Sequence, residues 1–261
     1  MKILRWLLAS FSLYSRIPVP GFKGSEDDYA HSLIFFPLVG AVIGVVIYGI
    51  NSSAGAGVIP VTARIFLTIL CPILVTGGFH LDGFMDTEDA LNSYGSARKK
   101  LEILKDPHIG AFAVISLVKW GLLYGAAVSA ILVSEEAGAT MPQLCISFVI
   151  SRCLSGLTSI CFEKAKKGGM LYEETRSHTK LMILFLAAEL VAAALFSVCL
   201  DPFSGIMGGL FFALFTFWYR RKMNSEFGGV TGDTAGFFVT VSEILEAVLL
   251  AVCVLIRGVL L

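Results

Sequence analysis

The chain has 261 residues, of which 56% are hydrophobic and 15% are charged, and its mean hydropathy is +0.80. A soluble domain of this length cannot bury so much apolar surface, so the composition predicts an integral membrane protein. Twenty basic and twenty acidic residues cancel, which excludes the bulk basicity typical of nucleic-acid binding. We expect one membrane-embedded domain over residues 1–261 that contacts lipid and binds no nucleic acid.

The N-terminal residues 1–15 show an amphipathic pattern rather than that of a signal peptide. Their apolar core is short, and no small-x-small cleavage site follows it. One helical stripe carries the large apolar side chains Leu4, Leu7, Leu8, Phe11 and Tyr14. We therefore expect this segment to lie along the membrane interface as a helix.

Seven apolar runs follow, most of them close to the ~20 residues that cross a bilayer. They cover residues 34–50, 58–76, 111–133, 143–162, 181–200, 204–219 and 237–257. The sixth run is short, so it either spans with little tilt or dips into the membrane, and it could form a hairpin with the fifth across Asp201-Pro202. The predicted fold is all-α: a polytopic bundle of about seven transmembrane helices plus the N-terminal interfacial helix.

Basic residues gather on one side of this predicted bundle. Sixteen of the twenty Lys and Arg residues lie in the stretches 1–33, 77–110, 163–180 and 220–236, whereas the opposite connections carry none. By the positive-inside rule, the N-terminus and the polar motifs face the cytoplasm. The sequence thus predicts a multi-pass protein whose active site is cytoplasmic.

An acidic motif follows the second predicted span. It reads Gly77-Gly78-Phe79-His80-Leu81-Asp82-Gly83-Phe84-Met85-Asp86-Thr87-Glu88-Asp89. If this stretch is helical, Asp82, Asp86 and Asp89 fall at i, i+4 and i+7 on one face, where their mutual repulsion calls for a cation. A solvated helix start explains one or two acids, but not three in register. The pattern indicates a magnesium-dependent phosphate reaction, with Glu88 off the acidic face and Gly83 allowing close approach.

Basic and polar residues follow these acids within the same connection. Arg98, Lys99 and Lys100 fit a polyanionic substrate and the positive-inside signal equally well. The segment Lys105-Asp106-Pro107-His108 stands nearer the next span, where the proline fixes a turn or a helix start. Its lysine, aspartate and histidine are the better candidates for substrate contact.

A glycine-rich stretch, residues 227–236, opens the last span. Gly229, Thr231 and Gly232 can present backbone N–H groups to a phosphate at a helix N-terminus, and Asp233 adds a carboxylate beside them. The alternative is a plain flexible loop capped by its own side chains. That alternative explains the glycines better than it explains the unit Thr-Gly-Asp.

Two further acids, Glu243 and Glu246, lie deeper in the last apolar run. Acids inside a membrane are functional candidates by default. Pairing with Arg64, Lys119 or Arg152, the basic residues within other predicted spans, would instead give them a structural role.

These motifs together resemble the cobalamin synthase family, the adenosylcobinamide-GDP ribazoletransferases, over nearly the whole chain. The resemblance rests on Ser15-Arg16-Ile17-Pro18-Val19-Pro20, Phe36-Pro37-Leu38-Val39-Gly40, Gly78-Phe79-His80-Leu81-Asp82-Gly83 with Asp86 and Asp89, Lys105-Asp106-Pro107-His108-Ile109-Gly110-Ala111-Phe112, and Gly228-Gly229-Val230-Thr231-Gly232-Asp233. The string His-Leu-Asp-Gly-x-x-Asp-x-x-Asp followed by Thr-Gly-Asp is highly specific.

The resemblance implies transfer of the cobinamide phosphate of adenosylcobinamide-GDP to the 5′ oxygen of α-ribazole or of its 5′-phosphate. GMP is released, Mg²⁺ is required, and the setting is the inner membrane of a prokaryote late in cobalamin synthesis. The large corrinoid suggests an open cleft among helix ends or between the subunits of a homo-oligomer.

The same resemblance distributes the roles among the residues. The expected metal ligands are Asp82, Asp86, Asp89 and Asp233, the last of which could instead orient the nucleophile. The general base is Asp82 or His80, and the two stay open because geometry precedes pKa in that choice. Lys105, Arg16 and His108 would offset developing negative charge. The remaining substrate contacts expected are Gly83, Asp106, Gly229, Thr231 and Gly232.

Two other functions are compatible with a polytopic chain that carries acids at one membrane face. A CDP-alcohol phosphatidyltransferase similarly uses Asp-Gly and further aspartates, but its pattern continues Asp-Gly-x-x-Ala-Arg, and Met85-Asp86 stands where Ala-Arg is needed. A transporter or a structural subunit of a membrane complex is the alternative from another class. Substrate flux without turnover would identify a transporter, whereas release of GMP would identify the transferase.

Overall fold

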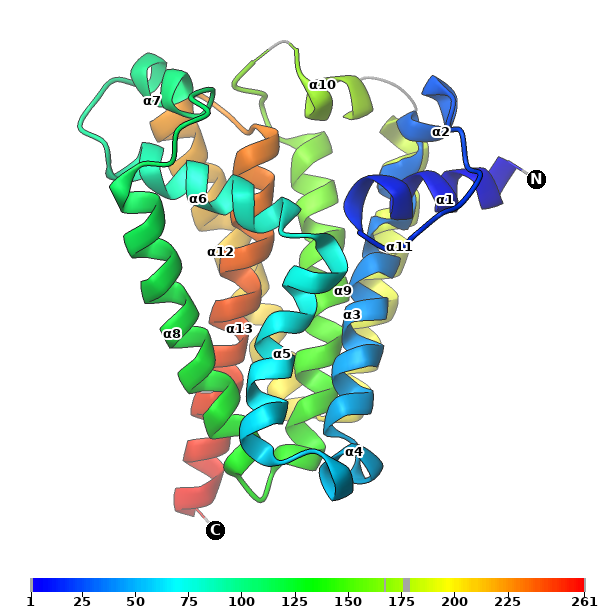
Figure 1. Ribbon diagram of the computed structural model, residues 1–261, viewed down its shortest axis with the longest axis vertical. Coiled ribbons are helices and arrows are strands. Elements are labelled where there is room, and N and C mark those ends of the chain that lie inside the picture. Colours follow the sequence, from blue (N-terminus) through cyan, green and yellow to red (C-terminus); the bar gives the residue numbers. More distant parts are fainter. Residues whose placement is uncertain (1, 167, 176–178, 261) are drawn as a thin grey trace.

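The computed structural model describes residues 2–166, 168–175 and 179–260. In this part of the chain all regular structure is helical, apart from one isolated β-bridge (Figure 1). The elements are α1 (Lys2–Tyr14), α2 (Glu26–Ala30), a 3₁₀ turn η1 (Ser32–Phe35), α3 (Phe36–Asn51), α4 (Ser53–Val58), α5 (Val61–Thr76), α6 (Phe79–Asn92), α7 (Ala97–Ile103), α8 (Ala111–Val133), α9 (Ala137–Cys161), α10 (Met170–Thr175), α11 (Thr179–Leu200), α12 (Pro202–Phe227) and α13 (Gly232–Leu260). The predicted all-α membrane bundle is confirmed.

Six helices, counted over the described residues, are long and apolar enough to cross a membrane. They are α3 with its preceding turn, α8, α9, α11, α12 and α13. A seventh span results if α5 and α6 are taken together, because these two form an apolar pair bent by 96°. The predicted count of about seven spans thus depends on α5, which has 16 residues and follows the bundle axis, whereas α6 runs across it (Figure 1).

The sixth predicted span differs most from its expected form. The run 204–219 was expected to be short or to dip, but α12 has 26 residues and continues to Phe227. Its last two turns carry Arg220, Arg221 and Lys222, so the apolar run ends before the helix does. Asp201 caps α12 through the Phe203 N–H, and Pro202 occupies its first turn, which explains the break from α11.

The N-terminal helix α1 crosses the bundle axis instead of following it, as an interfacial helix should (Figure 1). Tyr14 is buried against the bundle, whereas Leu4 is exposed on the outside. Arg5 ties α1 to α2 by an ion pair with Asp28 at 2.7 Å, and the Trp6 ring stacks on His31. The helix is therefore anchored on one side and leaves apolar residues free to meet lipid.

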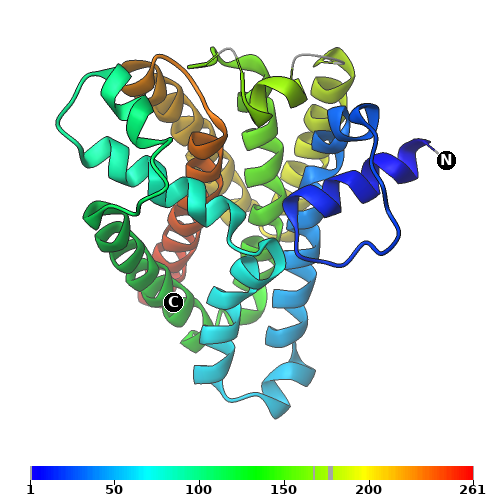
Figure 2. The ribbon, with the colours of Figure 1, turned by 45° about the horizontal axis from the view of Figure 1, so that its top comes forward.

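Two glycines cause the sharp turn between α5 and α6. Gly77 and Gly78 have φ values of 67° and 81°, in the left-handed region where a side chain is strained. Both N–H groups bond back to the Ile73 carbonyl, which closes the last turn of α5. As a result α6 runs across one end of the bundle, outside the spans, where α1, α7 and α10 also lie (Figures 1 and 2).

A buried ion pair joins the two central helices α9 and α13. Arg152, 1% exposed, places Nη1 2.5 Å from Oε1 of Glu243 and 2.9 Å from the Phe148 carbonyl. Ser151 donates a further hydrogen bond of 2.8 Å to the same carboxylate oxygen. Glu243 thus has the structural role that pairing predicts. Glu246 has no basic partner in the described part of the chain and instead packs against Gly208 of α12.

Breaking this pair on one side should destabilise the bundle more than replacing both partners. Arg152→Ala leaves the Glu243 carboxylate buried without its cation, a loss we expect to cost about 3–5 kcal/mol. The double variant Arg152→Met/Glu243→Leu leaves no buried charge and should cost less. Unfolding by SDS in mixed micelles measures both, and a single variant as stable as the double one would contradict this account.

Candidate functional site

The acidic motif forms the helix α6, as its spacing predicted. Asp82, Asp86 and Asp89 lie in register along one side; Asp82 is exposed, and the other two are half-buried. Glu88 points elsewhere: its buried carboxylate accepts a 2.6 Å hydrogen bond from Ser116 of α8. Glu88 therefore fastens α6 to α8, and the three aspartates remain available on another face.

Glycines let α6 pack directly against the start of α13. A Cβ atom added to Gly83 would lie 2.8 Å from the Asp233 carbonyl oxygen and 2.9 Å from its Cα. A Cβ on Gly236 would lie 2.8 Å from the His80 carbonyl oxygen. Since backbone stands on both sides, neither contact tolerates a side chain. This crossing brings Asp233 to the acidic face of α6.

The electrostatics of Asp86 link it to the other three aspartates. Burial and the neighbouring carboxylates of Asp82, Asp233 and Asp89 raise the pKa of Asp86 to about 6. Like charges that oppose ionisation in this way are a feature of functional carboxylate groups. Gly110, at the start of α8, closes the far end of the cluster, because a Cβ there would overlap the Asp89 carboxylate.

The donor set of this cluster fits a hard divalent cation. All four groups are carboxylates, the ligands that Mg²⁺ prefers, and the raised pKa of Asp86 indicates uncompensated negative charge. Among the described residues, however, no three Asp, Glu, His or Cys side chains converge at metal-ligand geometry. Mg²⁺ needs only one or two carboxylates when water and substrate phosphate complete its shell, so Asp82, Asp86, Asp89 and Asp233 would suffice to hold it.

A short backbone bridge brings a second segment to the site. The Val230 N–H donates to the Glu163 carbonyl at 2.8 Å, and the Ala165 N–H donates to the Val230 carbonyl at 3.0 Å. Gly229, with φ 147°, has no room for a side chain against this segment. The substrate contact expected of Gly229 stays a prediction; in the structure this glycine packs against the backbone of the bridge.

This bridge places Lys166 beside Asp233, a neighbour that the sequence analysis missed. Partial burial lowers the pKa of Lys166, the Asp233 carboxylate raises it, and the Lys105 ammonium lowers it again. Lys105, predicted from the sequence, therefore reaches the same region. In the sequence, Lys166 is one of several basic residues in a connection, and only the bridge between the preceding residues and Val230 distinguishes it.

Arg16 approaches the acids from the opposite side. Its N–H donates to the Val75 carbonyl at 2.8 Å, and its side chain lies across Gly77, where it leaves no room for a Cβ. In the described ranges its guanidinium has no ion-pair partner, and together with Asp82 it lines one cavity. The structure thus brings Arg16 to the site as expected.

Asp106 and His108 are less closely tied to the cluster. Asp106 accepts hydrogen bonds from the backbone N–H of His108 at 3.0 Å, and its carboxylate lies 2.6 Å from the His108 Nδ1. These contacts lower the pKa of Asp106. Both side chains are exposed in the loop before Gly110 and line neither cavity beside Asp82.

His80 is not part of the acid cluster. Its ring is buried, stacks on Phe36 at 5.2 Å between centroids, and lines an inner cavity with Arg152 and Glu243. Nδ1 has no hydrogen-bond partner among the described residues. Of the two candidates for general base, only Asp82 is exposed where substrate could reach it.

Two cavities meet at Asp82. The smaller, of about 260 Å³, lies between Phe79, Asp82, Gly83, Lys166, Tyr172 and the start of α13, including Thr231, Gly232 and Asp233. The larger, of about 690 Å³, lies between Arg16, Gly77, Gly78, Phe79, Asp82 and Met85. The exposed aspartate thus forms a wall common to both.

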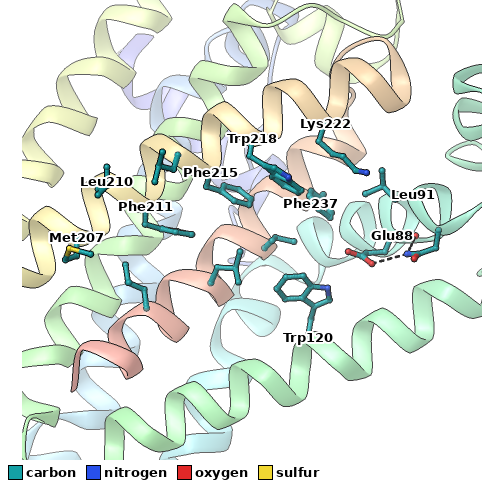
Figure 3. Close-up of a pocket in the computed structure, with 15 residues that line it drawn as sticks. Glu88, Leu91, Trp120, Met207, Leu210, Phe211, Phe215, Trp218, Lys222 and Phe237 are labelled. Atoms are coloured by element: carbon teal, nitrogen blue, oxygen red, sulfur yellow. Dashed lines mark hydrogen bonds between the residues drawn. The ribbon is translucent and has the colours of Figure 1, made fainter. Parts of the chain in front are cut away.

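A third hollow, of about 730 Å³, lies on the other side of α6 and is lined mainly by apolar and aromatic side chains (Figure 3). Glu88 and Lys222 stand at one end of it, and Trp120, Phe211 and Trp218 follow along its length. It holds none of the four aspartates, and its walls come from α8, α12 and α13. The three aspartates of α6 therefore lie away from this hollow.

Comparisons with known proteins agree on one family. The family model of cobalamin-5-phosphate synthase matches residues 6–253. An adenosylcobinamide-GDP ribazoletransferase of Lachnoclostridium phytofermentans is 37% identical over 99% of this chain and 98% of its own length. Proteins of the same name from Pseudomonas fluorescens and Pseudomonas syringae are 34% and 33% identical, over 95% and 96% of this chain and 97% and 98% of their own. No solved structure matches.

The acid cluster should make stability depend on pH. The folded pKa of Asp86, about 6, exceeds its ordinary value of 3.8, so its contribution to stability is full below pH 3.8 and falls as pH rises through 6. Asp86→Asn removes this loss and should raise the melting temperature at pH 8 more than at pH 5. Added Mg²⁺ should then stabilise the wild type more than the variant.

Glu135 is an exposed acid at the opposite end of the bundle, so Glu135→Gln serves as the control. It should leave the melting temperature unchanged at both pH 5 and pH 8. Differential scanning fluorimetry in detergent without divalent cations gives the comparison. An Asp86→Asn variant that melts below the wild type at pH 8 would show that the carboxylates do not repel one another.

Proposed function

This chain belongs to the cobalamin-5-phosphate synthase family, and from that premise we propose that it is a membrane transferase that joins adenosylcobinamide-GDP to α-ribazole or its 5′-phosphate and releases GMP. One observation carries the proposal: the crossing of α6 and α13 gathers four carboxylates beside Lys166, Lys105 and Arg16. Acids that hold a cation and bases that meet phosphate are the groups that transfer of a phosphate ester needs.

We propose that Asp82, Asp86, Asp89 and Asp233 hold Mg²⁺. The bound ion would neutralise the pyrophosphate and the charge that develops on the departing phosphate. Lys166 and Arg16 flank the aspartates from two sides and would contribute positive charge at the phosphate oxygens. The common wall formed by Asp82 would keep the two substrates in adjacent cavities.

The nucleophile follows from the chemistry of the family name. A product that carries a 5-phosphate has the 5′ oxygen of its ribazole already esterified. The nucleophile must then be another hydroxyl of the ribose, in place of the 5′ oxygen expected from the sequence. That hydroxyl oxygen bonds to the phosphorus nearest the cobinamide, and the bond from this phosphorus to the GMP oxygen breaks. Asp82, exposed between the cavities, would accept the hydroxyl proton in preference to the buried His80.

We also propose that the site faces the cytoplasm of a prokaryotic cell and that the chain lies in its inner membrane. The connections rich in lysine and arginine lead to the end of the bundle where α6 lies (Figure 1). The positive-inside rule places such an end in the cytoplasm. GMP and the ribazole substrate are polar, and this orientation lets them arrive from and return to water.

Reconstitution of the full chain into proteoliposomes tests the activity. We expect release of GMP that requires adenosylcobinamide-GDP, the ribazole substrate and added Mg²⁺ together, and that stops when EDTA is added. Undiminished release in EDTA would contradict the metal, whereas uptake of substrate without any GMP would contradict the transferase and identify a transporter.

Removal of one carboxylate should abolish turnover without unfolding the chain. Asp82→Asn and Asp86→Asn keep the side-chain shape and remove the charge, so we expect GMP release to fall at least about 100-fold while insertion into the membrane stays normal. Glu88→Gln is the matched control on the other face of α6, and it should keep most of its activity. Full activity in either aspartate variant would exclude that residue from the metal site.

The helix crossing itself can be tested with a single methyl group. Gly83→Ala puts a Cβ within 2.8 Å of the Asp233 backbone, so α6 must move away from α13. We expect GMP release to fall about 10-fold or more, because misplacement by about 1 Å can cost 100-fold. Gly209→Ala, where a Cβ meets nothing within 4 Å, controls for a glycine-to-alanine change in a helix. Equal activity of the two variants would contradict the close crossing.

A further inference from the structure

The smaller cavity beside Asp82 has a wall that the sequence motifs did not identify. This wall comes from the segment after α9, where Lys166 and Tyr172 lie, and it faces Phe79 of α6 and the first residues of α13. The volume, about 260 Å³, lies near the lower end of the ~300–1000 Å³ typical of small-molecule sites. A cavity of this size suits a nucleotide far better than it suits a corrinoid.

Among the residues that the structure describes, Lys166 is the cation of this cavity that has no partner. Lys164, two residues earlier, donates to the Ser159, Ile160 and Phe162 carbonyls and so caps the end of α9. Lys166 makes no hydrogen bond or ion pair with any residue that the structure describes, although it is partly buried and near Asp233. An unpaired, partly desolvated ammonium in a cavity is available for an anionic ligand.

Aromatic side chains occupy the same cavity as the lysine. Phe79 and Tyr172 both line it, and 41% of the Phe79 surface is exposed. A planar base stacks on such rings with little dependence on its identity. The start of α13, a helix of 29 residues, adds the positive end of its dipole near Thr231 and Gly232.

We propose that this cavity binds a nucleoside 5′-phosphate, with the phosphate toward Lys166 and the base against Tyr172 and Phe79. The inference rests on the proposed function, in which two molecules carry such a group: the guanylate that leaves and the 5′-phosphate form of the ribazole. The larger cavity on the other side of Asp82 then takes the corrinoid. Phosphate bound in the small cavity lies next to the acids that hold the metal.

Direct binding to the purified full chain in nanodiscs tests the site without turnover. GMP and α-ribazole 5′-phosphate are measured separately by equilibrium dialysis in Mg²⁺. For the nucleotide that uses this cavity, we expect Lys166→Met to weaken binding about 10- to 100-fold, the usual effect of losing a charged hydrogen bond. Lys166→Arg should restore most of the affinity. The exposed Lys23→Met is the control and should bind as the wild type does.

The aromatic wall has its own pair of variants. Tyr172→Ala should weaken binding of the same nucleotide about 10-fold, whereas Tyr172→Phe, which keeps the ring, should leave the affinity unchanged. If only the affinity for GMP falls, the cavity binds the leaving nucleotide. If only the affinity for α-ribazole 5′-phosphate falls, the cavity binds the acceptor. Either result supports the site. Unchanged affinity for both nucleotides in Lys166→Met and Tyr172→Ala overturns it.

These outcomes separate the inference from the activity on which it rests. Normal GMP release by the wild type together with unchanged affinities in the variants would overturn the nucleotide cavity and leave the proposed function intact. Nucleotide binding that depends on Lys166 in a chain without turnover would support the cavity and overturn the proposed function.

Discussion

The contact between α6 and α13 is the constraint on which the site depends. Gly83 and Gly236 remove the side chains that would separate the two helices, and backbone fills the space on both sides. Three acids come from α6 and one from α13, so the fourth acid joins the other three only if the helices touch. The contact also has an electrostatic cost, because burial and the neighbouring carboxylates, that of Asp233 among them, raise the pKa of Asp86 to about 6. Carboxylates held together against their repulsion are prepared for a cation.

Two other interactions fix the position of α13. Deep in the bundle, Arg152 and Glu243 join it to α9, and a buried charge pair tolerates little displacement because either partner alone is costly. At its start, the bridge between Val230 and the Glu163–Ala165 segment holds the glycine-rich stretch against the end of α9. Both anchors connect α13 to the same helix. The helix α13, whose first turn carries Asp233, is therefore held at both its start and its middle against α9.

Local sequence pattern predicted most of the fold and the common helix face of three aspartates. Apolar runs of bilayer length located the spans, and the spacing of Asp82, Asp86 and Asp89 predicted their common face, because both signals depend only on helix geometry. The length of α12 was missed, since hydropathy marks where lipid ends and not where the helix ends. The surroundings of His80, Gly229 and Lys166 depend on which segments of the chain come into contact in the fold. The spacing within one motif carries no information on such meetings.

The turn between α5 and α6 places the aspartates between two unfavourable environments, the lipid interior and bulk water. Carboxylates in the middle of a bilayer are costly, yet full exposure to water would weaken their attraction for the Mg²⁺ that we propose they hold. By bending 96° at Gly77 and Gly78, the chain lays the acidic helix across the end of the bundle. There Glu88 and the apolar side of α6 pack on α8 and α13, while Asp82 stays in contact with water. The membrane-spanning helices thus support α6 from an apolar, low-dielectric side, and the polar substrates need only reach the end of the bundle.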